Sequence, residues 1–377
     1  MKCTQLAGLF LTLALLGGCT AEAGTPGSAP AAVQTFQNVT IDSGFDTVIT
    51  LVEQTADQTA YQEHFNEMCR QFSYYNSLFD IYNDYEGINN LKTINDNAGK
   101  QPVKVDPALI DLLDTAQELY ELSDGAFDIT IGSLLSVWHE ARTEGLALNE
   151  QGAYGSLPDQ SVLMEAAEHR GFEHIVIDRE NNTVYIDDPQ VKLDAGGIAK
   201  GFAAERTAQV LEEKHCDHAA INAGGNNRTI GSKYDGSPWN VGIQNPDGEG
   251  PLFVVQVKGT NSFVTSGDYE RFYIAEDKRR LHHIIDPVTL FPAEYSRSVT
   301  IITKDSGHAD CLSTALFVLP YEDGLNVLKN YTEQTGNPAE AIWIMKKDNA
   351  PASEYSFDKG EYRILYTPAL EGSIVRN

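Results

Sequence analysis

Two polar residues near position 310 carry the first chemical signal in this sequence. Asp310 and Thr314 lie four residues apart in HADCLSTA, so a helix predicted over 309–319 presents both on one face. A carboxylate and a hydroxyl one turn apart, joined by a carbonyl from elsewhere, form an all-oxygen site that suits Mg²⁺. The spacing is equally explained if Asp310 caps the helix and Thr314 packs, so both interpretations stay open.

A glycine turn followed by a lysine carries the second signal. In KLDAGGIAKG, a short strand ends at Asp194, two glycines open a turn, and Lys200 falls in the first turn of a helix predicted over 198–213. Free N–H groups at a helix N-terminus bind anions, and a lysine there adds positive charge. The pattern matches neither nucleotide-binding glycine fingerprint. The alternative is a tight turn with Lys200 in solvent.

Two further segments carry weaker signals. His282 and His283 precede Ile-Ile-Asp-Pro, and histidine serves as a base or as a metal ligand near neutral pH. Because neighbouring residues of a strand face opposite sides, we expect at most one of the two histidines to be functional. The segment SDGAFDITIG (123–132) places small residues and an aromatic ring after a helix end. It either lets a flat ring lie against the backbone or marks a helix end and a strand start.

The pattern of apolar residues predicts the elements that position these segments. It predicts a strand over 45–54, a long helix with aromatic residues from Tyr61 to Phe79, and a hairpin from HIVID and TVYID. Asp106-Pro107 and Pro158-Asp159 start two more helices, the second ending at Gly171. From residue 191 onward, strands such as VKLD, HAAIN, SFVTS and SVTIIT outnumber helices, which are expected at 198–213, 309–319 and 322–332. Helices bunched early and strands clustered late predict an α+β fold.

Composition limits the function classes. The chain has 377 residues, 42% hydrophobic and 21% charged, with 27 basic against 54 acidic side chains and a formal charge of −27. This balance is globular and argues against nucleic-acid binding, which needs cations to neutralise phosphates. An anionic substrate must instead be held by a metal, a few local cations or backbone N–H groups. The five cysteines are scattered without a C-x-x-C pair, so neither a zinc site nor a disulfide framework is readable from their spacing.

The N-terminus reads as an export signal. The stretch from Leu6 to Leu16 is apolar apart from Gly8 and Thr12 and is too short to span a bilayer as a helix; it leads into Leu16-Gly-Gly-Cys19. This pattern is similar to a bacterial lipobox. We therefore expect a signal peptide over 1–18, a lipidated Cys19, a Gly/Ala/Pro-rich tether over 19–35 and a folded domain over 36–377. The protein would be lipid-anchored to the cell membrane on its extracytoplasmic side. The alternative is an ordinary secretory signal in which Cys19 is incidental.

Together and in order, six segments resemble those of the FAD:protein FMN transferase family, the ApbE-like flavin transferases. They are SDGAFDITIG, LDAGGIAKG, INAGGNNRTIG, VTSGDYERFY, HHIIDPVT and ADCLSTALFVLP. The resemblance runs from about residue 40 to 350. Each motif alone is weak, but six in the family's order, behind a lipoprotein-like signal, are specific.

The resemblance implies a fold and an activity. The fold would be a two-lobed α+β domain with a mixed or antiparallel sheet core and an FAD cleft between the lobes. The enzyme would use Mg²⁺ to cleave FAD and attach FMN covalently to a threonine or serine of an acceptor flavoprotein, with release of AMP. The alternatives are an Mg²⁺-dependent FAD pyrophosphatase that yields FMN and AMP, and a non-catalytic FAD-binding lipoprotein.

The resemblance also implies residue roles. Asp310 and Thr314 match metal ligands, Gly197 matches a position that lends a carbonyl, and His283 matches a histidine taken as the base, with Asp310 also catalytic. Ser313 stands where some relatives have a further acidic ligand. The FAD-contacting positions are matched by Phe45, Tyr82, Ala126, Phe127, Asp128, Asp194, Lys200 and Ile285. The sequence departs from the family at Leu290, where many relatives have glycine, and at Asn226 and Asn227, where an acid is frequent.

Overall fold

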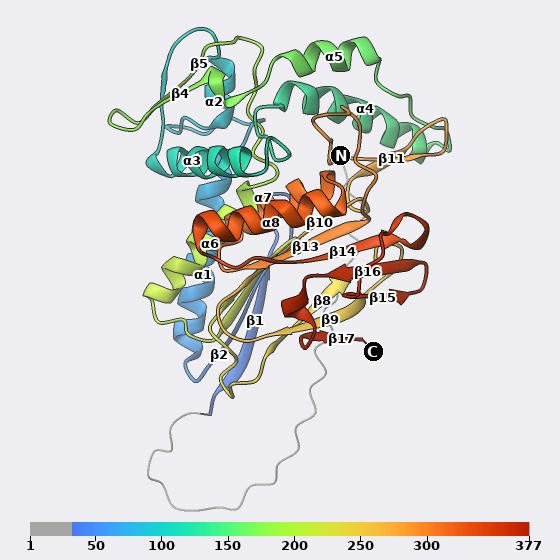
Figure 1. Cartoon of the computed structure of the whole chain (residues 1–377). Coiled ribbons are helices and arrows are strands. Elements are labelled where there is room, and N and C mark those ends of the chain that lie inside the picture. Colours follow the sequence, from blue (N-terminus) through green and yellow to red (C-terminus); the bar gives the residue numbers. More distant parts are fainter. Residues whose placement is uncertain (1–31, 377) are drawn as a thin grey trace, which may run out of the picture.

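The computed structural model describes residues 32–376. The expected signal peptide, the lipidation at Cys19 and nearly all of the expected tether therefore lie outside the described residues. The first strand, β1 (Gln34–Thr40), begins slightly before residue 36. Figure 1 shows two lobes, with a large sheet and its covering helices below and a mainly helical lobe above. None of the helices described in this range is long and apolar enough to cross a membrane.

One nine-stranded sheet forms the core of the larger lobe, and every neighbouring pair of its strands is antiparallel. Its strands in spatial order are β1, β2 (Ile49–Thr55), β6 (Ala219–Ala223), β7 (Asn226–Ile230), β10 (Ser262–Gly267), β13 (Ser298–Thr303), β14 (Glu340–Lys346), β16 (Tyr362–Tyr366) and β15 (Ser356–Lys359). The whole of β13 is buried, because Ile301 faces the main core and Ile302 faces a second apolar cluster. Burial on both faces explains why SVTIIT shows no polar alternation.

Helices cover one face of this sheet and a small sheet covers part of the other (Figure 1). The helices are α1 (Gln58–Phe79), α6 (Ala199–Glu213), α7 (Ser306–Val318) and α8 (Tyr321–Thr335). The small sheet is β8 (Trp239–Gln244), β9 (Pro251–Val257) and β17 (Ile374–Val375). Side-chain caps fix two of the helix starts: Asp57 accepts N–H bonds at α1, and Asp305 accepts the His308 N–H at α7. These caps set where α7 begins and hence where its polar residues fall.

The second lobe is assembled from shorter elements. They are α2 (Leu91–Asp96), α3 (Pro107–Leu122), α4 (Gly132–Glu150), α5 (Gln160–Glu168), the sheet of β3 (Val103–Lys104), β5 (Thr183–Ile186) and β4 (Ile175–Asp178), and the hairpin of β11 (Phe272–Ile274) and β12 (Arg280–His282). Short 3₁₀ turns lie at Phe172–His174, Lys347–Asn349 and Pro368–Leu370. The predicted starts of two helices are confirmed, since Asp106 caps α3 and Asp159 caps α5.

Two local predictions need correction, and the α+β class is confirmed. VKLD forms no strand: it joins the 126–132 segment through a single bridge, with the Gly132 N–H bonded to the Lys192 carbonyl at 2.9 Å. Helix α4 was not predicted at all. Glycines begin and interrupt it, and they are needed for close approach: a Cβ at Gly145 would lie 2.3 Å from the Tyr273 ring. Glycines lower helix propensity, so tertiary packing rather than local preference maintains α4 here.

Candidate functional site

Helices α6 and α7 bring the acidic residue Asp310 to the glycine turn. Asp310 is buried in the second turn of α7, and its Oδ2 accepts the Gly201 N–H of α6 at 2.9 Å. A Cβ at Gly201 would lie 2.2 Å from the Ser306 carbonyl oxygen, so only glycine permits this contact. The cap of α7 is Asp305. The capping explanation for Asp310 is therefore wrong, and its Oδ1 accepts no bond from the described residues.

Oxygen atoms gather around Thr314, one turn after Asp310. A Cβ at Gly197 would lie 3.1 Å from Thr314 Oγ1, which places the Gly197 backbone beside that hydroxyl. The Ser266 hydroxyl lies 2.8 Å from Ser313 Oγ and 3.4 Å from Thr314 Oγ1. Carboxylate, hydroxyl and backbone oxygens are the donors that Mg²⁺ prefers. The three predicted metal ligands therefore lie together, and their chemistry fits a hard divalent cation. Ser266 joins this group without having been predicted.

Of the two adjacent histidines, the structure engages one and leaves the other free. His282 Nε2 donates to the Ala293 carbonyl at 2.8 Å, and its Nδ1 accepts the Ile284 N–H, so both ring nitrogens are used. His283 Nδ1 is buried and has no hydrogen-bond partner among the described residues. Burial and the positive charge of Arg271 lower the pKa of His283 well below its usual value of 6.5. His283 is therefore neutral at pH 7, with a ring nitrogen available to a ligand.

Three basic side chains lie near enough to His283 for their charges to lower its pKa: Arg271, Arg142 and Lys200. The two arginines also act to lower the pKa of the Asp194 carboxyl. None of the three bases forms an ion pair within residues 32–376. In a chain of charge −27, three unpaired bases close together form an anion-attracting patch.

Neither Arg142 nor Arg271 was predicted from the sequence to belong to the site. Arg142 lies on α4, the helix that was not predicted. Arg271 stands in the quoted motif VTSGDYERFY, and that position was its only signal. Asp194, predicted to contact FAD, has an Oδ1 that accepts the Gly196 N–H at 2.8 Å, and burial raises the pKa of its carboxyl. The glycine turn thus holds one oxygen of this carboxyl in place.

Two of the other predicted FAD-contacting residues, Phe127 and Tyr82, border the same region. Phe127 is buried, and its ring would lie 3.1 Å from a Cβ at Gly197. The ring of Tyr82 is 62% exposed and lies 5.6 Å from that of His139, a neighbour of Asp194. An exposed tyrosine ring beside a polar site presents a surface on which a flat aromatic ligand stacks.

The remaining predicted FAD-contacting residues have mainly structural contacts. The Asp128 carboxylate accepts bonds from the Thr130 N–H and hydroxyl, and half-buried Ala126 lies in the preceding turn. Ile285 is buried in the apolar cluster of the upper lobe. Phe45 packs edge-on against Phe72, with ring centres 6.0 Å apart. Phe45 therefore contacts α1, and the structure does not join it to Asp310 or Thr314 through any described hydrogen bond.

Leu290, where the sequence departs from the family, has a structural explanation. Its φ of 64° lies in the left-handed region, which glycine adopts without strain. The Leu290 carbonyl accepts the Trp138 indole N–H at 2.9 Å. The turn after Asp286 therefore keeps its glycine-type geometry although it carries a leucine.

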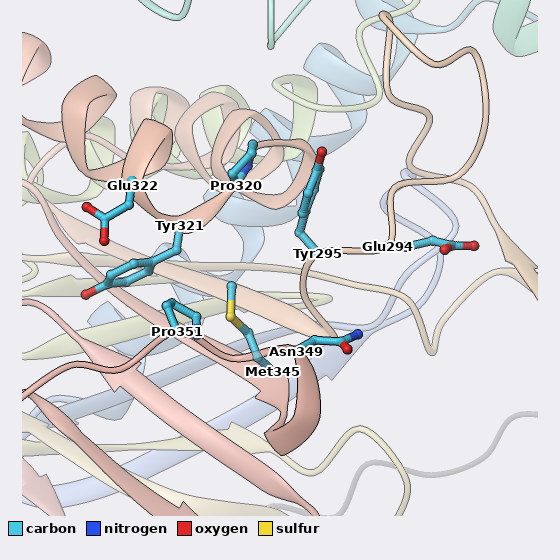
Figure 2. Close-up of a pocket in the computed structure, with 8 residues that line it drawn as sticks. All are labelled: Glu294, Tyr295, Pro320, Tyr321, Glu322, Met345, Asn349 and Pro351. Carbon is cyan, nitrogen blue, oxygen red and sulfur yellow. The ribbon is translucent and has the colours of Figure 1, made fainter.

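A cleft of about 440 Å³ lies beside the end of the ADCLSTALFVLP motif, with Pro320 in its lining and without Asp310 or Thr314. Figure 2 shows it between the start of α8, the end of β14 and the loop that carries Tyr295. Its lining residues are Glu294, Tyr295, Pro320, Tyr321, Glu322, Met345, Asn349 and Pro351. None of these was predicted from the sequence to take part in the site.

The fold and the site define an α+β protein that places an all-oxygen cluster beside a basic patch and a neutral histidine. The ApbE family model matches residues 44–337, and this chain belongs to the ApbE family. FAD:protein FMN transferase of Treponema pallidum is 37% identical over 257 residues, 64% of this chain and 68% of that protein. The Klebsiella pneumoniae protein of the same name is 32% identical over 277 residues, 71% of this chain and 80% of that protein. The resemblance inferred from the motifs is confirmed, and the chain is an enzyme of the transferase class.

Solved structures agree with this assignment. The ApbE protein from Thermotoga maritima superposes with a TM-score of 0.71 at 30% identity, covering 85% of this chain and 97% of that one. The flavin transferase ApbE from Vibrio cholerae superposes with a TM-score of 0.69, covering 90% of this chain and 99% of that one; at 24% identity it supports the fold alone.

Proposed function

We propose that this chain is an Mg²⁺-dependent FAD:protein FMN transferase. It would break the pyrophosphate of FAD and attach FMN to a threonine or serine hydroxyl of an acceptor flavoprotein, with release of AMP. The observation that carries the proposal is the juxtaposition of the Asp310–Thr314–Gly197 oxygens with unpaired bases and a free histidine nitrogen. When bound, Mg²⁺ would neutralise phosphate charge and stabilise the leaving group.

The basic patch would hold the phosphates. Lys200 stands in the first turn of α6 and would bring its positive charge to the phosphates, while the Gly201 N–H of the same turn is already bonded to Asp310 Oδ2. Arg142 and Arg271 would approach from the upper lobe. Preorganised cations of this kind stabilise charge without reorganisation during reaction. The flavin ring would lie toward Tyr82 and Phe127. Phe45, Ala126, Asp128, Asp194 and Ile285 are the other residues that we expect to contact FAD.

His283 would act as the base. The acceptor hydroxyl oxygen forms a bond to the FMN-side phosphorus while the bond from that phosphorus to the bridging oxygen breaks, and AMP leaves with that oxygen. The hydroxyl proton passes to His283 Nδ1, the nitrogen that has no partner within the described structure. A neutral imidazole is required for this step, and the lowered pKa of His283 supplies it.

The extracytoplasmic setting of this reaction rests on the N-terminal sequence. We propose that Cys19 is lipidated and anchors the enzyme to the extracytoplasmic side of the cell membrane, as the motif Leu-Gly-Gly-Cys favours. A short tether would leave the folded domain free to meet an acceptor flavoprotein at the same membrane.

The proposal is tested with the chain lacking residues 1–19, incubated with FAD, Mg²⁺ and an acceptor domain from a respiratory flavoprotein. Intact mass spectrometry of the acceptor and chromatography of the nucleotides are the readouts. An Mg²⁺-dependent mass gain equal to FMN, with one AMP per adduct, is the expected result. Free FMN and AMP without an adduct would instead identify a pyrophosphatase, and intact FAD would identify a binder without turnover.

A further inference from the structure

A second cluster of possible metal ligands lies outside the candidate active site. It consists of Glu53 on β2, His64 on α1 and Cys216 in the turn between α6 and β6. One donor atom from each residue lies within 4.8 Å of the other two. The residues are 3%, 5% and 0% exposed. Three different ligand types therefore converge in the interior from three elements.

The cluster lies at the far end of its strands from Asp310. Glu53 pairs with Ala219 at the start of β6, whereas Ala223 at the other end of β6 precedes the Gly224–Gly225 turn. A Cβ at Gly225 would lie 3.7 Å from the Thr265 carbonyl oxygen, and the next residue, Ser266, contacts Thr314. The length of β6 thus separates the Glu53 cluster from the Mg²⁺-type oxygens.

The orientation of His64 matches that of a metal-bound histidine. Its Nδ1 lies 2.9 Å from Glu53 Oε2, inside the cluster, and its Nε2 lies 3.2 Å from the Lys214 carbonyl oxygen. Histidine ligands in metal sites donate their second ring N–H to a carbonyl or carboxylate, which fixes the ring and leaves the first nitrogen for the metal. The chain therefore supplies both the ligand and the group that orients it.

The charges of the three residues indicate that the cluster would bind one divalent cation and release two protons. Without a metal, both ring nitrogens of His64 face acceptors, so the ring is an imidazolium that balances the Glu53 carboxylate, and Cys216 is a neutral thiol. A divalent cation that replaces the His64 Nδ1 proton and the Cys216 thiol proton faces one carboxylate and one thiolate. Both states are neutral overall, so neither leaves an uncompensated charge in the interior. The exchange is one cation bound for two protons released.

We propose that Glu53, His64 and Cys216 form a buried binding site for a divalent cation of the zinc class. Sulfur, nitrogen and oxygen donors together favour Zn²⁺ over Mg²⁺, which takes oxygen ligands. Three protein ligands leave one tetrahedral position for water. The metal would fasten β2, α1 and the α6–β6 turn to one another.

The first test uses Co²⁺ as the probe on the chain lacking residues 1–19, after removal of metals with a chelator. Cobalt bound by a thiolate shows a near-ultraviolet charge-transfer band, which all-oxygen sites lack. We expect one equivalent of Co²⁺ to produce this band, and Cys216→Ser to remove it and weaken binding more than about a hundredfold. Cys69→Ser, which changes a cysteine of α1 outside the cluster, is the matched control and keeps the band. The absence of the band in the unmodified chain, or its persistence in Cys216→Ser, would overturn the site.

A second measurement covers the case in which Cys216→Ser does not fold. Calorimetric titration of the unmodified chain with Zn²⁺ in two buffers of different ionisation enthalpy counts the protons released. We expect about two protons per bound Zn²⁺ and a higher thermal midpoint of the Zn²⁺-loaded chain. A count near zero, or an unchanged midpoint, would contradict the proposal. FMN transfer need not be measured, so this test is independent of the proposed activity.

Discussion

Replacing Asp310 by asparagine separates metal binding from folding at this site. Asparagine has nearly the same shape as aspartate, and its carbonyl oxygen is able to accept the Gly201 N–H that Asp310 Oδ2 now accepts at 2.9 Å. Its NH₂ group would then stand where Oδ1 stands. An amide nitrogen with its hydrogens is no ligand for Mg²⁺, so the substitution removes both a donor atom and a negative charge from the oxygen cluster.

The expected magnitudes differ sharply between stability and activity. A hydrogen bond to a charged group contributes about 1.5–3 kcal/mol and a neutral one about 1 kcal/mol, so Asp310→Asn should change the free energy of unfolding by roughly 1 kcal/mol. Metal stabilisation of transition-state charge amounts to several kcal/mol. Loss of about 3 kcal/mol of it slows FMN transfer on the order of a hundredfold. A small stability change should therefore accompany a large loss of activity.

The assay measures the initial rate of FMN attachment to the acceptor over a range of Mg²⁺ concentrations, together with urea unfolding. Asp305→Asn is the matched control, because it is the same change on the same helix. Asp305 only caps α7, by accepting the His308 N–H at 2.9 Å, and asparagine caps helices about as well. The control should keep its activity and its Mg²⁺ dependence. Unimpaired transfer by Asp310→Asn at limiting Mg²⁺, or equal losses in both variants, would refute the assignment of Asp310 as a metal ligand.

Three further outcomes are expected. The pKa of His283 is lowered well below 6.5, so its base form persists at neutral pH, and kcat/KM should fall only as the pH drops through that lowered pKa. The substitution His283→Gln should reduce the rate of FMN transfer at least about a hundredfold. FAD binding by this variant, followed by flavin fluorescence, should be unchanged. Glu205→Gln removes the buried carboxylate that binds Arg228 at 2.8 Å. Urea unfolding should show that the free energy of unfolding falls by about 3–5 kcal/mol. A fall of less than about 1 kcal/mol would contradict the expected cost of leaving Arg228 buried without its partner. Gly201→Ala puts a Cβ 2.2 Å from a carbonyl oxygen of α7 and should lower the free energy of unfolding by about 1–3 kcal/mol or more. The control Gly372→Ala has open space around its Cβ and should lower it by less than about 1 kcal/mol. Equal effects of the two substitutions would show that α6 and α7 adjust freely.

The buried Arg228–Glu205 pair has a role beyond its own free energy. Glu205 Oε2 also accepts the Ser306 N–H at the first residue of α7, at 3.0 Å. The pair thus joins α6, β7 and the N-terminus of the helix that carries Asp310. Its loss should shift α7 against α6, so a part of any activity loss in Glu205→Gln would come from displacement of Asp310 rather than from chemistry.

Local features of this protein were determined by the sequence alone. The caps of α3 and α5, at Asp106 and Asp159, follow from hydrogen bonds between residues two or three apart. The shared helical face of Asp310 and Thr314 follows from the helical repeat. The order of the six motifs identified the family. These features depend on neighbours along the chain, so a linear reading contains the interactions that produce them.

Only the tertiary structure decided which distant residues meet. Arg142 lies near His283 because α4 packs against the β11–β12 hairpin through glycine contacts that no local sequence pattern predicts. Glu53, His64 and Cys216 show no metal-binding spacing, and sheet register together with the α6–β6 turn brings them together. A distant loop residue also decides that His282 is the engaged histidine of the pair, because the Ala293 carbonyl accepts its Nε2–H. Residues that are distant in the sequence meet at these sites because helices and strands pack against one another. The contacts that stabilise this packing join residues far apart in the chain, so a local sequence pattern does not contain them.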